Sequence, residues 1–467
     1  MTADVTASEP FAAVGPLLGL SRRRVSIGFL NWAHALDHFV MLVYPTVVIE
    51  LQAVYGRSYS ELIGPSTAPF IAFGLFSLPA GLLADRWSRR NMMVAFYLGC
   101  GASLIGAALA PSLVGLAIAL FVLGIFAAIY HPVGTAMVIE SATHRGRTMA
   151  FNGVCGNLGI SLAAGITAIL TAALSWRGAF FVPGIVCIAT GIAYVWPIPD
   201  EEQHKSARSS TADVPLSAAV AAIIFGLFIV VALAAGLVFN TLSVALPKIV
   251  DERVSGISLV EIGGLTTAVF ICGAIAQMAV GRLVERFRLH ILFAVLAVMQ
   301  FSGVVWTAYA SGVMVLFALA FTMASICGQI TVNDLIIARY TADAWRGRVF
   351  AVRYFLTFMT SGIAVSMIAF LYGRGGFPLV LGTTAFVALA FLIAVVAIAY
   401  IAANVERDRV PHHAGGVSGA GQVVRPALFS SSQTERIRRA SASAFTWIAD
   451  CATPAPWRSA RRRRTAY

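Results

Sequence analysis

A ten-residue stretch in the first long apolar segment, LNWAHALDHF at residues 30–39, carries side chains that can exchange protons. An amide, a carboxylate and two imidazoles interrupt residues suited to lipid; they are Asn31, His34, Asp37 and His38. At 100° per residue these four fall within an arc of about 120° on one helix face. A charge inside a membrane is costly unless it faces a cavity or a partner. The stretch therefore predicts a functional polar face.

Later apolar segments contain further polar groups. In IYHPVG at residues 129–134, Tyr130 and His131 precede a proline that breaks a helix. Near the other end of the chain, apolar surroundings hold Gln329, Asn333, Asp334 and Arg353. We expect Asp334 and Arg353 to pair, either as a structural ion pair or as part of a substrate site. For Asn31 and Gln329, two interpretations stay open: a hydrogen bond between helices or a substrate contact.

The composition defines the elements that must position these residues. Hydrophobic residues make up 59% of the 467 and charged residues 12%, and the mean hydropathy is +0.83. A soluble chain carries about 25% charged residues, so a polytopic membrane protein is expected. The net charge of +12 does not indicate a nucleic-acid partner, because the arginines gather at the ends of apolar segments and in the tail.

Continuous apolar runs predict an all-α membrane protein with twelve transmembrane helices, since each run can cross a hydrocarbon core that needs roughly 20 residues. The expected spans are 26–53, 61–84, 92–110, 112–140, 147–173, 177–197, 216–247, 259–281, 289–309, 313–338, 347–372 and 378–402. They form two six-helix bundles, 26–198 and 216–403. A cytoplasmic N-terminal segment (1–25), a cytoplasmic linker (199–215) and a basic, disordered cytoplasmic tail (404–467) are also expected.

The distribution of basic residues predicts the orientation. The N-terminal segment and the even-numbered loops carry sixteen arginines and lysines, and the odd-numbered loops carry five. Because basic residues favour the cytoplasmic side, both termini are expected in the cytoplasm. We expect a bacterial inner membrane, with the lipid bilayer as the chain's surroundings; the oligomeric state is not predicted.

An internal repeat relates the two bundles. GLLADRWSRR (81–90) and GRLVERFRLH (281–290) are 200 residues apart, and THRGRTMA (143–150) and AWRGRVFA (344–351) are 201 apart. Two marker pairs at nearly one offset indicate a six-span unit used twice.

The loop after the second span resembles the signature loop of the major facilitator superfamily. Gly-x-Leu-x-Asp-Arg-x-x-Arg-Arg is present as Gly81, Leu83, Asp85, Arg86, Arg89 and Arg90, with Ser88 in place of the second glycine. The copy at 281–290 is weaker. The resemblance covers residues 26 to about 403. It implies that this loop, with Glu140 as a partner of its arginines, holds the two bundles together on the cytoplasmic side during gating. Gly81 is expected to allow close helix approach, and Asp85 to accept hydrogen bonds from a helix N-terminus.

The resemblance also implies a central cavity lined by the first, fourth, seventh and tenth spans. His131 would then face the polar side of the first span and share a proton with His34, Asp37 and His38. The predicted substrate-cavity residues are Asn31, Tyr130, Gln329, Asn333, Asp334 and Arg353.

Two positions depart from the drug/proton antiporters of this superfamily. Leu120 stands where these antiporters often have an arginine, and residues 152–165 lack their Gly-Pro pair. The His-Pro pair at 131–132 is instead similar to the fosmidomycin-resistance type of exporter.

The expected function is secondary active transport of a small organic compound, by proton-coupled efflux (antiport). No Gly-x-x-x-x-Gly-Lys-[Ser/Thr] run for ATP chemistry is present, and neither a cofactor, a resident metal nor an enzyme activity is expected. One alternative is proton-coupled uptake of a metabolite. Another is transport of a divalent metal ion, because His34 and His38 are four residues apart with Asp37 between them.

Overall fold

Helices are the expected outcome for these apolar runs, since a helix satisfies every backbone polar group without water. The computed structural model describes residues 22–198, 218–340 and 343–407. Most of the predicted N-terminal segment, linker and tail lies outside these residues. The helices are α1 (Arg22–Tyr55), α2 (Tyr59–Ile63), α3 (Thr67–Ala84), α4 (Arg89–Ala108), α5 (Leu113–Ala127), α6 (Thr135–Ser141), α7 (Arg145–Leu174), α8 (Gly178–Val195), α9 (Ala218–Arg253), α10 (Leu259–Leu283), α11 (Leu289–Tyr309), α12 (Met314–Tyr340) and α13 (Asp343–Arg407).

Within the described residues, eleven helical segments are long and apolar enough to cross a membrane. The last of them, Phe355–Ile401, has 47 residues and is interrupted by non-helical backbone at Gly375 and Gly376. Gly376 has a φ of 60°, which a glycine adopts without steric cost. Division at this break gives twelve spans, so the predicted all-α, twelve-helix fold is confirmed.

The boundaries differ from the predicted spans at several points. α9 continues to Arg253, whereas the seventh span was expected to end at residue 247. Lys248 and Arg253, two of the five basic residues assigned from the sequence to the odd-numbered loops, therefore lie on a helix. The predicted fourth span is also not one continuous α-helix, because a π-helical turn, Tyr130–Gly134, separates α5 from α6.

The internal repeat has a structural counterpart. At the end of α3 the amides of Arg86 and Trp87 both donate to the carbonyl of Leu83, at 3.1 and 2.9 Å. At the end of α10 the amides of Arg286 and Phe287 donate to Leu283, at 3.0 and 2.9 Å. Capping boxes 200 residues apart open α2 and α10, Ser58 with Glu61 and Ser258 with Glu261. The two copies thus fold alike where their sequences match.

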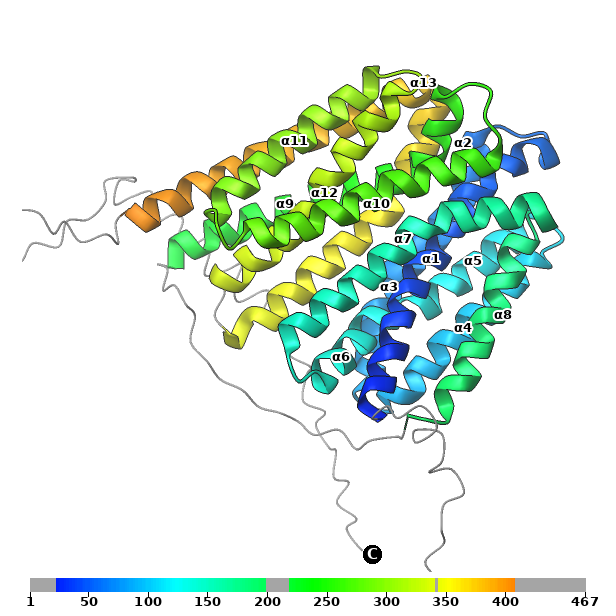
Figure 1. Cartoon of the computed structure of the whole chain (residues 1–467), viewed down its shortest axis with the longest axis horizontal. Coiled ribbons are helices and arrows are strands. Elements are labelled where there is room, and N and C mark those ends of the chain that lie inside the picture. Colours follow the sequence, from blue (N-terminus) through cyan, green and yellow to red (C-terminus); the bar gives the residue numbers. More distant parts are fainter. Residues whose placement is uncertain (1–21, 199–217, 341–342, 408–467) are drawn as a thin grey trace, which may run out of the picture.

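Close packing between helices depends on glycine at several crossings. A Cβ atom at Gly159 of α7 would lie 2.0 Å from the carbonyl oxygen of Ala35 in α1, and one at Gly124 of α5 would lie 2.1 Å from that of Pro69 in α3. The first half of the chain (22–198) meets the second (218–407) where α7 packs on α10 (Figure 1). There the amide of Gly165 donates to the hydroxyl of Thr267 at 3.1 Å, and Asn157 donates to Gln277.

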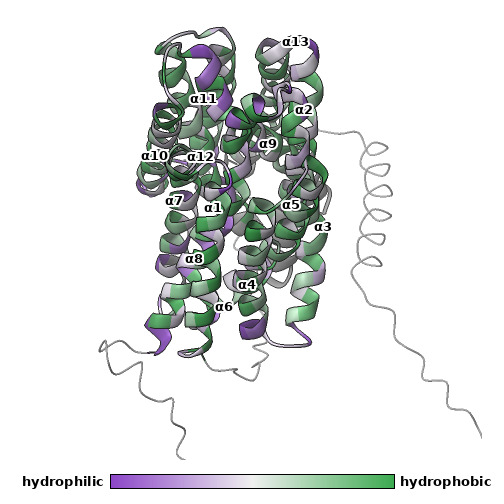
Figure 2. Cartoon of the chain, turned by 90° about the vertical axis from the view of Figure 1, so that its right-hand side faces the viewer, coloured by the Kyte–Doolittle hydropathy of each residue, from purple (hydrophilic) through white to green (hydrophobic). Residues whose placement is uncertain are grey.

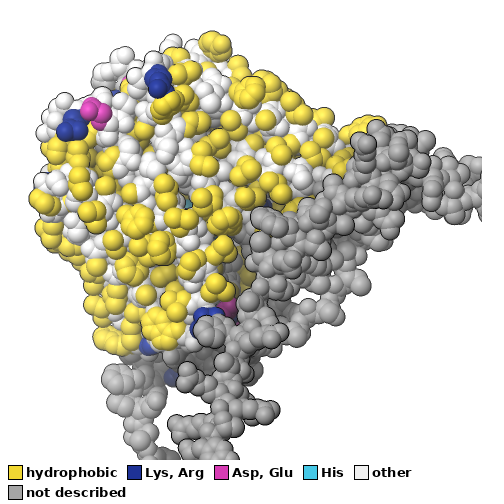
Figure 3. All heavy atoms as spheres, turned by 180° about the vertical axis from the view of Figure 1, so that it is seen from behind, with side chains coloured by type: hydrophobic (Ala, Val, Ile, Leu, Met, Phe, Trp, Pro, Cys, Tyr) yellow, Lys and Arg dark blue, Asp and Glu magenta, His cyan; other side chains and the backbone are white. Residues whose placement is uncertain are grey.

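The outer surface is apolar over the length of the helices. Figure 2 shows hydrophobic residues along the helices, with hydrophilic residues more frequent near their ends. In Figure 3 one face is covered by hydrophobic side chains, and charged groups appear at its upper and lower edges. Large apolar residues such as Leu82 and Tyr309 are 65% and 86% exposed. Such a surface is compatible with lipid and not with water, so the chain is an integral membrane protein.

Candidate functional site: a buried carboxylate among imidazoles

The site is a group of four side chains from α1 and the π-helical turn, named here the Asp37 cluster: His34, Asp37, His38 and His131. Asp37 is 1% exposed, and its Oδ2 lies 3.4 Å from Nε2 of His131. Among the described residues, neither carboxylate oxygen of Asp37 has a partner in hydrogen-bond geometry. A buried acid without such partners is costly to keep in a folded protein.

The three imidazoles of the cluster surround one another. The ring centroids of His34 and His38 are 5.0 Å apart, and that of His131 is 5.4 Å from each. Nδ1 of His34 lies 2.7 Å from the backbone carbonyl oxygen of Asn152. Because a carbonyl only accepts, Nδ1 carries the proton in that bond, and Nε2 is the acceptor nitrogen of the neutral ring. The predicted approach of His131 to the polar face of the first span is thus present in the structure.

The π-helical turn positions His131. Pro132 has no N–H to donate, so the helix cannot continue as a regular α-helix through this point. Single π-helical turns inside α-helices are frequent at functional sites. A Cβ atom at Gly81 of α3 would lie 3.3 Å from Cβ of Pro132, so the predicted close approach at Gly81 is made to this turn.

An amide network joins the predicted residues Asn31 and Tyr130 to α7. Nδ2 of Asn152 donates to Oδ1 of Asn31 at 3.0 Å and lies 2.8 Å from the hydroxyl of Tyr130. For Asn31 this is the hydrogen bond between helices, one of the two interpretations that the sequence allowed. A substrate contact stays a prediction for Asn31 and for Tyr130. Asn152 was not predicted; its only signal was an amide inside an apolar run.

The second half of the chain reaches the cluster through an aromatic ring. Phe358 of α13 lies 4.8 Å from the ring of His131, and Phe73 of α3 lies 6.0 Å from it. The two phenyl rings are themselves 4.7 Å apart. The imidazole of His131 therefore lies where the two halves of the chain meet.

The predicted residues of the second half make separate contacts. Gln329 of α12 donates to Oε1 of Gln300 at 2.5 Å and lies 3.3 Å from the carbonyl oxygen of Leu296, both in α11. Gln329 therefore forms a hydrogen bond between helices, which was one of its two predicted interpretations. Asn333 is buried, and within the described residues its Oδ1 has no hydrogen-bond partner. Asp334 pairs with Arg353, as expected. A role for these residues in the substrate cavity stays a prediction.

The signature loop is organised around Arg89. Its guanidinium pairs with Glu140 of α6, as expected, and lies 3.3 Å from Asp85. The expected bonds from a helix N-terminus to Asp85 are absent from the described contacts, because Ser88 is the N-cap of α4 and accepts from its third residue at 3.2 Å. Arg86 is exposed. The named partners of Arg89 all belong to the first half, so the gating role of the loop stays a prediction.

Arg90 has a structural role. Its guanidinium donates to the carbonyl oxygens of Val195 at 2.6 Å and Ile198 at 2.7 Å. Val195 is the last residue of α8 and Ile198 lies three residues beyond it, where the carbonyls of a helix end lack internal donors. Arg90 therefore caps α8 and joins it to α4.

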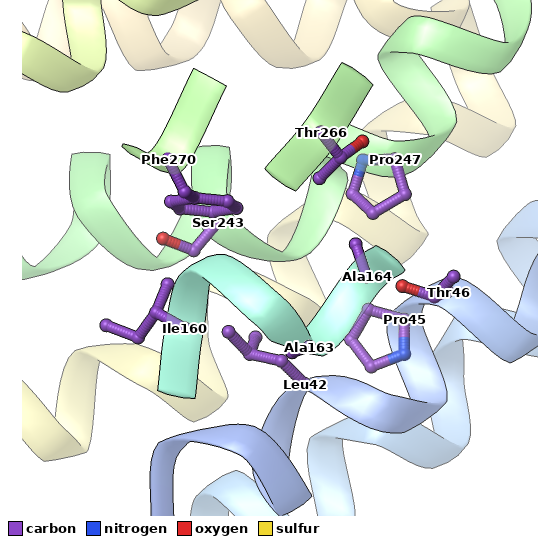
Figure 4. Close-up of a pocket in the computed structure, with 10 residues that line it drawn as sticks. All are labelled: Leu42, Pro45, Thr46, Ile160, Ala163, Ala164, Ser243, Pro247, Thr266 and Phe270. Atoms are coloured by element: carbon purple, nitrogen blue, oxygen red, sulfur yellow. The ribbon is translucent and has the colours of Figure 1, made fainter. Parts of the chain in front are cut away.

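Two features of the structure concern ligand binding: a group of three imidazoles and a small cavity. Ring nitrogens of His34, His38 and His131 lie within 4.8 Å of one another, as a metal-binding group requires. Separately, a small cavity lies between α1, α7, α9 and α10 (Figure 4). Its volume is about 10 Å³, on the order of one water molecule.

Together these features describe a polytopic helical membrane protein of two similar halves, with a buried ionisable group at their junction. The profile of the Major Facilitator Superfamily matches residues 28–259 and, again, residues 228–466. The chain belongs to the Major Facilitator Superfamily. Its membership makes it a membrane transport protein of some substrate.

Individual relatives are distant. The inner membrane transport protein YajR of Escherichia coli (strain K12) is 27% identical over 173 residues, which is 37% of this chain and 38% of that relative. A bacterial homologue of the human lysosomal transporter Spinster, solved in an inward-facing and occupied conformation, has a TM-score of 0.65 at 12% identity, over 86% of this chain and 98% of that one. A POT family transporter solved with 5-aminolevulinic acid has a TM-score of 0.64 at 12% identity, over 81% and 96%. These two structures support the fold.

Proposed function

We propose that the chain is a proton-coupled secondary transporter that exports a small organic compound, with Asp37 as the coupling carboxylate. The observation that carries this proposal is the position of Asp37: it is fully buried, its carboxylate lies 3.4 Å from His131, and the part of the chain that the structure describes gives it no hydrogen-bond partner. Ionisable groups inside a membrane domain are usually functional. The sequence has no Gly-x-x-x-x-Gly-Lys-[Ser/Thr] run, and we infer that an ion gradient is the energy source.

A proton on the Asp37 cluster can reside on the carboxyl or on an imidazole. His131 also contacts Phe358 of the other half at 4.8 Å. A change in how the halves pack would alter the surroundings of the same imidazole that faces Asp37, and this links protonation to alternating access.

The remaining assignments are part of the proposal. The protein lies in a bacterial inner membrane with both termini and the linker in the cytoplasm, as the distribution of basic residues indicates. The signature-loop residues Gly81, Asp85, Arg86, Arg89 and Arg90 gate the cytoplasmic side with Glu140. The His-Pro pair favours export of the fosmidomycin-resistance type over uptake by symport.

Transport of a divalent transition-metal ion is a second candidate, favoured by the 4.8 Å grouping of the three imidazoles. Imidazole and carboxylate are suitable ligands for such ions. Under this alternative His34 and His38 bind the ion directly, and the substrate is the metal and not an organic compound.

The test starts with growth screens of deletion and overexpression strains across toxic compounds, metals and nutrients, which identify the substrate and the direction. The purified protein is then placed in liposomes with an imposed pH gradient. Asp37→Asn should abolish gradient-driven accumulation and retain exchange of substrate at equilibrium. The control carboxylate Glu261→Gln, at the exposed start of α10, should behave as wild type.

Full pH-driven transport by Asp37→Asn would contradict the coupling role. Loss of transport by the wild type when a chelator is added, together with loss of metal binding in His34→Ala and His38→Ala, would replace it with the metal alternative.

A further inference from the structure

The short helix α2 places an aromatic residue of the first half inside the second half. α2 follows a turn at Gly56, whose φ is 62°, and the capping box of Ser58 and Glu61 fixes its start. Its first residue, Tyr59, is 1% exposed although it lies next to a loop. The ring of Tyr59 packs against Tyr372 and Phe377 of α13, with centroids 4.9 and 6.3 Å away.

A buried charge group of the second half completes the surroundings of Tyr59. Nζ of Lys248 in α9 lies 5.8 Å from the centre of the Tyr59 ring, a cation–π distance. The same Nζ is 2.5 Å from Asp251 and 3.7 Å from Glu252, and the Lys248 side chain is only 9% exposed. The hydroxyl of Tyr372 donates to Glu252. We name Tyr59, Lys248, Glu252, Tyr372 and Phe377 the Tyr59 cluster.

The halves also touch just inside this cluster. The small cavity of Figure 4 has walls from α1 and α7 on one side and from α9 and α10 on the other. Thr46 lies in its wall and is fully buried, and no described residue forms a hydrogen bond with its hydroxyl. The cavity holds about 10 Å³, so nothing much larger than a water molecule fits there.

We propose that Tyr59 is the positioning residue that closes this end of the transport pathway. The proposal rests on the function proposed above, since it assumes alternating access between two halves. In the present conformation Tyr59 fills the space between α13 and α9. When this end opens, the ring of Tyr59 must separate from the rings of Tyr372 and Phe377. The ammonium group of Lys248 must then become hydrated. The basic-residue distribution makes this the external end, opposite the signature loop.

The aromatic ring, and not the hydroxyl, carries the closure. The hydroxyl of Tyr59 is buried and has no hydrogen-bond partner among the residues that the structure describes, so its removal breaks none of the described bonds. Tyr59→Phe should therefore keep the pathway closed, whereas Tyr59→Ala leaves a hole at the junction. This contrast separates a packing role from a polar one.

Accessibility of a cysteine at Thr46 tests the proposal without a substrate. Thr46→Cys is introduced into a chain without other cysteines and treated with a membrane-impermeant maleimide, in vesicles of both orientations. Tyr59→Ala should raise the labelling rate from the Tyr59 side by at least about tenfold, since truncation of a buried aromatic shifts packing equilibria by more than that factor. Tyr59→Phe should not change it. The control is Tyr309→Ala, an exposed tyrosine at the end of α11.

A disulfide cross-link provides a second test, in which Tyr59 itself is unchanged. A Cβ atom at Gly373 would lie 3.4 Å from Cβ of Ser60, close to the separation in disulfides. Ser60→Cys with Gly373→Cys should form a disulfide on oxidation, hold Thr46→Cys unreactive and stop transport until it is reduced. The single cysteine variants should be unaffected.

The proposal is overturned if Tyr59→Ala labels no faster than wild type, if labelling rises only from the signature-loop side, or if the oxidised cross-link leaves transport intact. A different result would count against the proposed function alone. In that case labelling would respond to Tyr59→Ala as expected, while the screens and liposomes gave no transported compound.

Discussion

The crossing of α1 and α7 at Gly159 gives a quantitative prediction. In Gly159→Ala the new methyl group would lie 2.0 Å from the carbonyl oxygen of Ala35, and 2.8 and 2.9 Å from its C and Cα atoms. Ordinary contact begins at 3.4 Å, so the methyl is too close by 3.4 − 2.0 = 1.4 Å. All three atoms belong to the backbone of α1. No side chain can turn aside, and the two helices must move apart.

Overpacking of this kind costs about 1–3 kcal/mol. At roughly 2–4 °C for each kcal/mol in units of 150–250 residues, Gly159→Ala should unfold roughly 2–12 °C below wild type. The same helix offers the control: a Cβ atom at Gly153 meets nothing within 4 Å. Gly153→Ala should stabilise by about 0.5–1 kcal/mol, because alanine loses less backbone entropy in a helix.

The measurement is thermal unfolding of the two variants and wild type in the same detergent, followed by the remaining monodisperse peak on size exclusion. Equal midpoints for Gly159→Ala and Gly153→Ala would refute the packing argument. Since α1 also carries Asp37, Gly159→Ala should reduce transport in the liposome assay, and Gly153→Ala should not.

Two further predictions concern the charged groups. Asp85→Asn should strongly reduce transport with little change in unfolding temperature or membrane abundance, and normal transport by this variant would contradict the gating role. Arg90→Ala should reduce transport less but lower the unfolding temperature, because two carbonyls at the end of α8 lose their donor, which costs about 1–3 kcal/mol. Asp334→Asn and Arg353→Gln should each lower the unfolding temperature, and the double variant should be no less stable than the worse single one, because the pair is then removed together. Additive losses in that double-mutant cycle would mean that the two residues act independently.

Much of the architecture was predictable because long apolar runs leave a chain few choices in a membrane. The repeat offset and the signature loop then predicted the relation between the halves. At the site, Asp37 and the pairing of Asp334 with Arg353 were predictable from charge alone, since an ionised group in an apolar run needs a partner. The approach of His131 to Asp37 followed only from the family resemblance.

Other features depended on three-dimensional packing and had little local signal. Asn152 is one amide among apolar residues, and nothing in its neighbours indicates that it contacts both Asn31 and Tyr130. Lys248 was counted as a loop residue because the apolar run ends before it, but α9 continues and buries it against Tyr59. The partner of the Gln329 side chain could not be predicted. Whether this side chain faces α11 or a cavity depends on the rotation of α12 about its axis.

α7 joins two parts of the molecule that have been described separately. The carbonyl of Asn152 holds His34, and five residues later Asn157 bonds to Gln277 of the other half. Along a helix these positions are about 7.5 Å apart, too short a distance for the segment to bend between them. A shift of α7 therefore moves the carbonyl of Asn152 and the contact with α10 as one rigid piece. The His34 ring, which is bonded to that carbonyl, therefore changes its orientation whenever the second half moves relative to the first.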